Sequence, residues 1–317
     1  MRKQFKRGLA VGVLAAGMCV SAGAAEFINV LTGGTSGVYY PLGVAMSQVW
    51  GKAVPGSKTS VQATKASAEN LNLLQAGRGE AGISLGDAVS DAWNGNEEAG
   101  FKTPLKKLRV IAALWPNYIH FVATADSGIK SLADIKGKKI SVGAPKSGTE
   151  LNVRAILKAA NISYKDFAKV EYLSYAESVE LMKNKQLDVT LLSSGLGVAA
   201  LRDLAVSQKV VFLTIPADIV AKINDPAYTV GVIPAKTYEG QDSDVTTVSI
   251  QNYLVTQQGV STDTVYTMTK SMFENLDQLA SAHSAGKQIK KENAAKNPPA
   301  PLHPGAEKYY REIGLIK

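Results

Sequence analysis

The chain has 317 residues, a formal net charge of +8, and 45% hydrophobic residues. This length suits two lobes of ordinary size. Short basic clusters at residues 136–139 and 287–291 have no interleaved aromatic residues, so they are not typical of nucleic-acid binding.

The first 25 residues have the pattern of a cleaved secretory signal peptide. Four basic residues precede an apolar segment at residues 9–20, and small residues (SAGAA) follow at 21–25. The apolar segment is shorter than the roughly twenty residues that a bilayer requires. We therefore expect a periplasmic protein, cut after about Ala24 or Ala25, with a net charge of +8 − 4 = +4. Cys19 is the only cysteine, so the mature chain has neither a disulfide nor a thiol nucleophile.

A glycine- and hydroxyl-rich turn at residues 32–37 (TGGTSG) joins an expected strand at 28–31 to an expected helix. Apolar residues in that helix recur at helical spacing, at Val38, Leu42, Ala45 and Val49. Glycines let backbone N–H groups turn inward, and a helix N-terminus adds roughly half a positive charge. Such turns also serve as plain connectors, but this one is a candidate site for a carboxylate or phosphate group.

Short apolar runs alternate with helical patterns through most of the remaining chain. The runs expected as strands are residues 61–63, 83–85, 110–114, 119–123, 140–142, 170–173, 189–192 and 210–215. This alternation predicts the α/β class, with mostly parallel sheets flanked by helices. Ligands of such sheets bind at the carboxyl ends of the strands, where the turn at 32–37 lies.

Two residues after expected strands have both a functional and a structural interpretation. Asp87 follows the strand at 83–85 and either caps a helix or accepts a hydrogen bond from a ligand. Trp115 either packs on the carbon chain of a ligand or fills a hinge.

We expect the chain to cross between lobes near residues 115–116 and to return near 215–216. One lobe then comprises residues 26–115 plus 216–317, and the other comprises residues 116–215.

A second turn of the same design lies at residues 143–149 (GAPKSGT), after the expected strand at 140–142. Ser147 or Thr149 is a candidate N-cap for the helix that follows. The strand at 189–192 also ends in a polar turn, which contains Ser194 and Gly195. Two such turns about a hundred residues apart, each able to hold an anion, predict a two-lobed protein whose lobes face one ligand cleft.

Several segments, in this order, closely resemble the TAXI family, whose members are the solute-binding subunits of TRAP transporters. The segments are residues 32–43, 143–150, 173–178, 233–240 and 301–306. The resemblance implies a periplasmic binding-protein fold of type II-like architecture that closes on a small carboxylate. Glutamate, 2-oxoglutarate and related dicarboxylates are the ligands implied. It also implies delivery of the solute to a membrane permease that is driven by an ion gradient.

The resemblance also implies which residues contact the ligand. The matching positions are Thr35, Ser36, Gly37 and Tyr39 in the first turn, and Ser147, Gly148 and Thr149 in the second. The residue pattern adds Asp87, Trp115, Ser194 and Gly195 as candidate contacts. One departure leaves the identity of the ligand open, because Gly86 stands before Asp87 where relatives usually have a polar residue. We expect a monomer with no cofactor, no metal and no catalytic residue.

The sequence is compatible with two other functions. A secreted serine acylase or hydrolase is suggested by residues 127–130 (SGIK) and 146–149 (KSGT), which match two motifs of penicillin-binding enzymes. Too few residues separate these motifs to build the domain between them, and the three histidines lack metal-ligand spacing. His303 is expected to tie down the C-terminal segment. A ligand-sensing subunit of a membrane receptor would have the same site, so the sequence leaves that alternative open.

Overall fold

The computed structural model describes residues 26–317, so the expected signal peptide and Cys19 lie outside the described residues. Within residues 26–317, no helix has the length and apolar character needed to cross a membrane.

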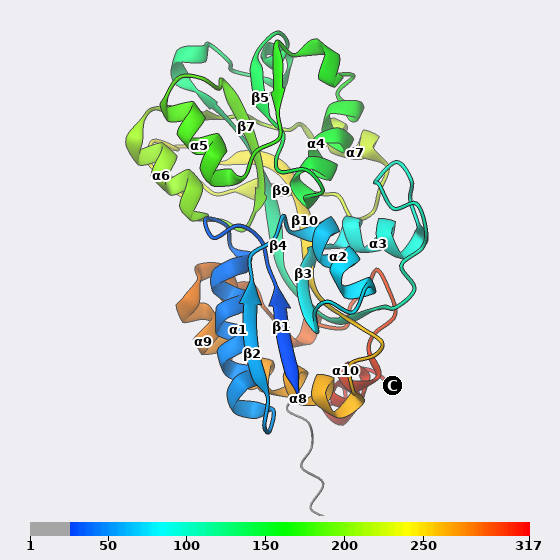
Figure 1. The fold of residues 1–317 in the computed structure, drawn as a ribbon. Helices are drawn as coiled ribbons and strands as arrows, with labels where there is room; N and C mark the ends of the chain where they lie inside the picture. Colours follow the sequence, from blue (N-terminus) through cyan, green and yellow to red (C-terminus); the bar gives the residue numbers. More distant parts are fainter. Residues whose placement is uncertain (1–25) are drawn as a thin grey trace, which may run out of the picture.

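Two lobes are joined by two long antiparallel strands (Figure 1). These strands are β4 (Leu108–Thr124) and β10 (Val245–Gln257). They belong to a sheet with the order β2-β1-β3-β10-β4-β7-β5-β6, in which β8 also pairs with β4 and β9 with β10. Because β4 and β10 run through both lobes, the sheet is continuous across the hinge.

The first lobe, drawn at the bottom of Figure 1, contains parallel strands at one end of the sheet. These strands are β1 (Phe27–Leu31), β2 (Lys58–Gln62) and β3 (Ala81–Leu85). Helices α1 (Tyr39–Ala53), α2 (Ser67–Gln75) and α3 (Gly86–Asn94) follow them in the chain. The C-terminal helices α8 (Thr262–Glu274), α9 (Leu276–Ala282) and α10 (Pro304–Glu312) complete this lobe.

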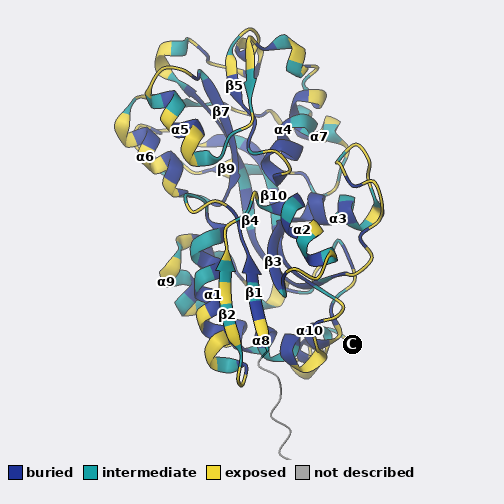
Figure 2. Cartoon of the chain, viewed as in Figure 1, coloured by how far each residue is buried: buried dark blue, intermediate teal, exposed yellow. Residues whose placement is uncertain are grey.

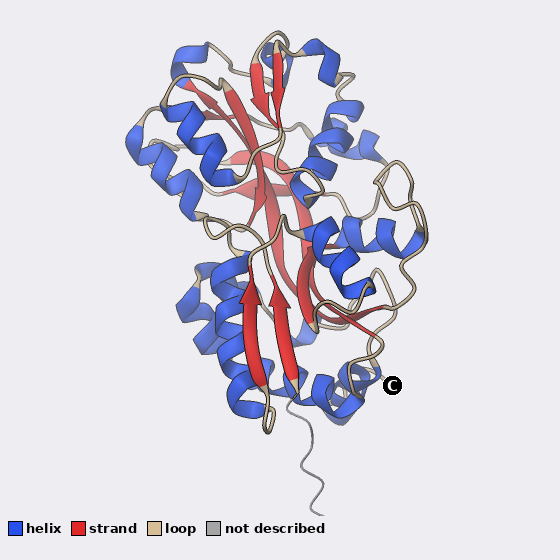
Figure 3. Cartoon of the chain, in the orientation of Figure 1, coloured by secondary structure: helices blue, strands red, loops and turns tan. Residues whose placement is uncertain are grey.

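The second lobe repeats this design with helices on both sides of its strands (Figure 3). Its parallel strands are β5 (Lys139–Ser141), β6 (Lys169–Glu171) and β7 (Val189–Ser194). The short strands β8 (Val210–Phe212) and β9 (Thr229–Ile233) pair antiparallel with the hinge strands. The helices are α4 (Gly148–Ala159), α5 (Tyr175–Lys183), α6 (Ala199–Ser207) and α7 (Ala217–Ile223).

Burial follows the sheet, which is covered by helices in both lobes (Figure 2). Every residue of β3 and β7 is buried, whereas β2 at the end of the sheet alternates between exposed and partly buried residues. Strands that are covered on both faces need apolar residues at successive positions, and this explains the continuous apolar runs in the sequence. The fully buried parallel strands β3 and β7 are thus those that the sequence predicted best.

The structure differs from the sequence predictions at the hinge. The two strands expected at 110–114 and 119–123 form one strand, β4, which continues through Pro116 opposite an irregularity in β10. Neither β9 nor β10 was predicted. The expected return near residues 215–216 lies within the second lobe, because Ile215 N donates to Thr246 O and β9 then pairs with β10. The chain returns to the first lobe only along β10.

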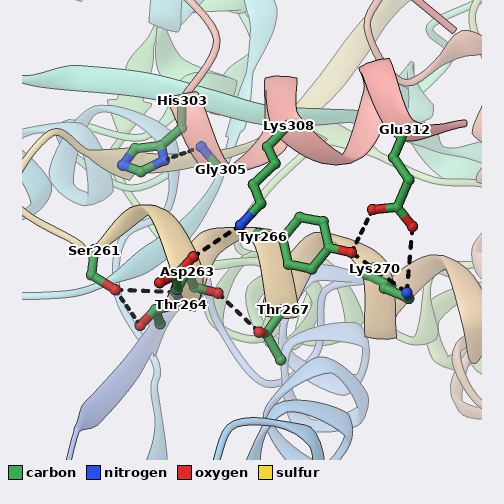
Figure 4. Close-up of polar contacts among 10 residues, drawn as sticks. All are labelled: Ser261, Asp263, Thr264, Tyr266, Thr267, Lys270, His303, Gly305, Lys308 and Glu312. Atoms are coloured by element: carbon green, nitrogen blue, oxygen red, sulfur yellow. Dashed lines mark hydrogen bonds and ion pairs between the residues drawn. The ribbon is translucent and has the colours of Figure 1, made fainter. Parts of the chain in front are cut away.

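His303 fixes the start of the last helix, α10, against α8 (Figure 4). Its Nδ1 accepts a hydrogen bond from Gly305 N at 3.1 Å, and its Nε2 lies 3.1 Å from Val260 O. Since a carbonyl only accepts, Nε2 carries the proton and the ring is neutral. Ion pairs between Lys308 and Asp263 and between Lys270 and Glu312 join the same two helices. The structure confirms that His303 ties down the C-terminal segment.

We expect His303→Ala to lower the free energy of unfolding by about 1–2 kcal/mol, because α10 loses its N-cap. Burial lowers the pKa of His303, so the stabilisation is complete above the pKa of an unfolded histidine and is lost as the pH falls toward the folded pKa. Urea unfolding of both proteins at several pH values measures this, and their difference in stability shrinks below about pH 6.

Asp263→Ala is the matched control, because it removes an exposed ion pair between the same helices and leaves the His303 cap in place. Its effect stays below about 0.5 kcal/mol. An equal loss of stability in both variants would show that the His303 cap contributes nothing specific.

Candidate functional site

A cavity of about 120 Å³ lies between the two lobes. It is lined from the first lobe by Gly33, Gly34, Ser36, Gly37, Val38, Tyr39, Thr64, Lys65, Ala66, Ser67 and Leu85. The second lobe contributes Ala144, Ser147, Gly148, Thr149, Ser174, Tyr175, Ser193 and Ser194. These segments lie at or just after the carboxyl ends of β1, β2, β3, β5, β6 and β7. The cavity therefore occupies the position where α/β sheets bind their ligands.

Four helices begin at the cavity wall: α1 and α2 from one lobe, and α4 and α5 from the other. The first N–H groups of a helix have no partner inside the helix, and its N-terminus carries partial positive charge. Among the described residues, the lining includes Lys65 but no aspartate, glutamate or histidine. The electrostatics of the cavity therefore favour an anion.

The second turn is shaped by one cap and one conformational constraint. Ser147 Oγ accepts a hydrogen bond from Glu150 N at 3.1 Å, so Ser147 is the N-cap of α4. Gly143 has a φ of +89°, and a Cβ there would lie 2.8 Å from the Thr149 side chain. The turn thereby places the start of α4, at Gly148 and Thr149, in the cavity wall.

Tyr175 connects the second turn to the end of β7. Its hydroxyl donates to Ser193 O at 2.7 Å and lies 2.8 Å from Thr149 Oγ1. Burial raises the pKa of Tyr175 to about 12, so the phenol keeps its proton. Because that proton is used on Ser193 O, the Thr149 hydroxyl donates to Tyr175 and offers only acceptor lone pairs to a ligand. Thr149 can then serve an anion through its backbone N–H.

A buried chain of hydrogen bonds runs beneath the cavity from one lobe to the other. Tyr39 OH donates to Asn252 Oδ1 at 2.5 Å, and Asn252 Nδ2 donates to Asn117 Oδ1 at 2.7 Å. Asn117 Nδ2 in turn donates to Ser193 O at 2.9 Å. Asn117 lies on β4 and Asn252 on β10, so the hinge strands carry this chain. Sequence analysis missed both asparagines.

The sequence from residue 30 to residue 314 matches the model of the NMT1-like family. The chain belongs to the NMT1-like family. Its fold is similar to that of the alkanesulfonate-binding protein SsuA from Xanthomonas axonopodis pv. citri bound to MOPS. The two are 14% identical with a TM-score of 0.51, over 93% of this chain and 96% of that one.

A second structure similar to this NMT1-like chain is PhnD1 from Prochlorococcus marinus in complex with methylphosphonate. It is 13% identical with a TM-score of 0.59, over 92% of this chain and 99% of that one. A third comes from work on glutathione import via GshT and the cystine ABC importer TcyBC of Streptococcus mutans. It is 16% identical with a TM-score of 0.52, over 84% and 98% of the two chains. The expected two-lobed α/β binding-protein fold is confirmed.

Most of the predicted site residues of the NMT1-like chain meet at the cavity. Those that line it are Ser36, Gly37, Tyr39, Ser147, Gly148, Thr149 and Ser194. They come from three separate segments and both lobes. The paired turns that the sequence placed on two lobes thus face one another across a single cavity.

Four predicted residues lie outside the cavity lining, each for a physical reason. Thr35 is exposed at the surface of its turn. Asp87 is buried and bonds to Asn152 and Tyr228, and the Trp115 indole donates to Asn117 Oδ1 at 3.2 Å. Gly195 packs so closely that a Cβ would lie 3.2 Å from both Ala285 and the Trp115 indole.

Two lining segments were missed, at Thr64–Ser67 and at Ser174–Tyr175. Ser174 forms a capping box with Glu177, and this local pattern was readable in the sequence. Ala66 has a φ of 68° and a ψ of −147°, a conformation that non-glycine residues rarely adopt. Strain of this kind leaves no pattern in the sequence.

Gly148 lies tightly against the other lobe at the cavity wall. A Cβ at this position would lie 2.6 Å from both Leu85 Cδ1 and Ser67 Oγ, which belong to the other lobe. We expect Gly148→Ala to weaken solute binding at least tenfold because the lobes can no longer meet. The thermal stability of the solute-free protein stays the same or rises slightly, since alanine favours the helix. Calorimetric titration and thermal unfolding measure the two effects.

Gly51→Ala is the control for this substitution, because Gly51 is in α1 and a Cβ there would lie nearest to the Thr59 side chain of the same lobe. It should leave affinity unchanged. Wild-type affinity in Gly148→Ala would show that the close contact is not needed for binding.

Proposed function

We propose that this protein is an extracytoplasmic solute-binding protein that captures a small carboxylate and delivers it to a membrane transporter. The observation that carries the proposal is the cavity between the lobes, which four helix N-termini surround without any lining carboxylate. Each lobe provides two of these N-termini, so an anion in the cavity is held better when the lobes are closed. The structurally similar SsuA and PhnD1 were solved with a sulfonate buffer and a phosphonate, which are also anions.

The size of the cavity supports a small solute. At about 10–15 Å³ for each water-sized position, 120 Å³ accommodates roughly ten non-hydrogen atoms. The turns at residues 33–39 and 144–149 lie on opposite lobes, so a dicarboxylate can place one acidic group against each. Glutamate, 2-oxoglutarate and related dicarboxylates, which the TAXI resemblance implies, have this size and charge.

The same resemblance supports a TRAP permease as the partner. The segments at 173–178 and 233–240 contribute to this resemblance. Within them, Tyr238 is buried and Tyr175 is partly buried.

The transporter type is decided by solute uptake into vesicles that contain the permease. Uptake driven by an ion gradient without ATP is the expected result, and a strict need for ATP would contradict it.

A thermal-shift screen of the mature protein tests the solute class. Glutamate, 2-oxoglutarate, malate and succinate are compared with methylphosphonate and an alkanesulfonate. A solute at a hundred times its Kd stabilises the folded state by about 2.7 kcal/mol, so a true ligand raises the melting temperature by several degrees. If only the phosphonate or the sulfonate raised it, the carboxylate proposal would be wrong.

Thr149→Tyr should abolish binding of any solute found in that screen, lowering affinity at least a hundredfold, because the larger side chain fills the cavity next to the start of α4. Thr35→Tyr makes the same chemical change in the other turn at an exposed position outside the lining, and it should change affinity by less than twofold. Calorimetric titration of both variants makes the comparison. Equal effects in the two variants would place the solute elsewhere.

A further inference from the structure

Asp87 joins the lobes through hydrogen bonds that the proposed solute contacts do not use. Asp87 lies in the first turn of α3. The two side chains that donate hydrogen bonds to its carboxylate belong to the other lobe. Asn152 Nδ2 lies 2.6 Å and Tyr228 OH 2.7 Å from Asp87 Oδ2, and Asn152 also donates to Tyr228 at 2.9 Å. All three side chains are buried. This cluster, which we name the interlobe latch, exists only when the lobes are closed.

The interlobe latch lacks one hydrogen-bond donor. Both donors converge on Asp87 Oδ2, while Asp87 Oδ1 and Asn152 Oδ1 are buried without any partner in the described chain. A buried acceptor without a donor destabilises the folded state, and more so when it carries charge. A proton on Asp87 would remove the charge and supply the missing donor.

The surroundings of Asp87 do not favour its charged form. The ionisable groups that face it are the carboxylates of Asp91 on α3 and Asp225 before β9, and the phenols of Tyr228 and Tyr39. Arg154 on α4 pairs with Glu150 at 2.9 Å. Its charge lowers the pKa of Asp91 rather than that of Asp87. No cation in the described residues compensates the Asp87 charge when the lobes close.

We propose that Asp87 is a positioning residue that takes up a proton when the lobes close, so that solute affinity depends on pH. The proton passes from solvent to Asp87 on closing and returns to solvent on opening. Asp87 acts through the closed conformation and not by touching the solute. The proposal rests on solute binding by lobe closure, as proposed above.

The direction of the effect follows from burial. In the closed structure, burial raises the pKa of Asp87 to about 6, despite the hydrogen bonds from Tyr228 and from the backbone of Ala88. Opening separates Asp87 from Asn152 and Tyr228 and returns it to solvent, where an aspartate has a pKa of about 3.9. The closed state then binds more protons, so acid favours closing. With these two values, affinity rises about tenfold between pH 7.5 and pH 5.

Asp87→Asn tests the latch, since asparagine has nearly the same shape and no charge. Its amide nitrogen adds a donor to the latch while its oxygen still accepts from Tyr228. We expect this variant to bind at pH 7.5 about as tightly as the wild type does at pH 5, with no change between these pH values. Calorimetric titration with the solute identified in the screen measures both proteins. A variant that keeps the wild-type pH profile, or a wild type with a flat profile, would overturn the proposal.

A second variant, Tyr228→Phe, should change the pH dependence of affinity in the opposite direction. It removes one donor from the Asp87 carboxylate and so destabilises the charged form further. Affinity should fall at pH 7.5 and recover at pH 5, giving a steeper pH profile than in the wild type. A uniform loss at both pH values would mean that Tyr228 is only structural, and would count against the latch.

Small-angle X-ray scattering of the solute-free protein separates this proposal from the solute assignment. The radius of gyration of the wild type should decrease from pH 7.5 to pH 5, and that of Asp87→Asn should not change. If no carboxylate bound at either pH, the proposed function would fail while this measurement still decided the latch. A radius of gyration that did not respond to pH in the wild type would overturn the latch alone.

Discussion

The geometry of the site depends on the antiparallel pairing of β4 and β10 where the two strands pass from one lobe to the other. Asn117 and Asn252 face each other there, at a point where the register of the strands is irregular. Their amides are buried and use their donors on Trp115 O, Asn117 Oδ1 and Ser193 O. Leaving one of these amides without a hydrogen-bond partner would destabilise the folded protein. The bonds therefore hold β4 and β10 at a defined distance beneath the cavity.

Local chemistry made part of this structure predictable. The turn around Ser147 has its cap, its glycine and its helix within a few residues, and Tyr39 follows the first turn directly. Both segments line the cavity in the structure. The parallel strands β3 and β7 were evident because complete burial demands an unbroken apolar run. In each case the physical cause and the sequence signal lie in the same short segment.

Long-range pairing made the rest unpredictable. The position of strand β10 depends on pairing with β3 and β4, which are far away in sequence. No pattern within residues 245–257 indicates that this strand returns to the first lobe. Asp87 was expected at the ligand because its turn ends a strand, but its contacts come from Asn152 and Tyr228 on the opposite lobe. Trp115 likewise points to Asn117 and stacks edge-on against Tyr39. The spacing of residues along the chain does not indicate which distant side chains will be in contact.

The tight contact at Gly148 has a consequence for kinetics. Ser67 and Leu85 of one lobe meet the start of α4 from the other so closely that no methyl group fits between them. A solute inside the cavity cannot leave past this contact until the lobes separate. A solute that leaves on this side of the cavity therefore dissociates no faster than the lobes open.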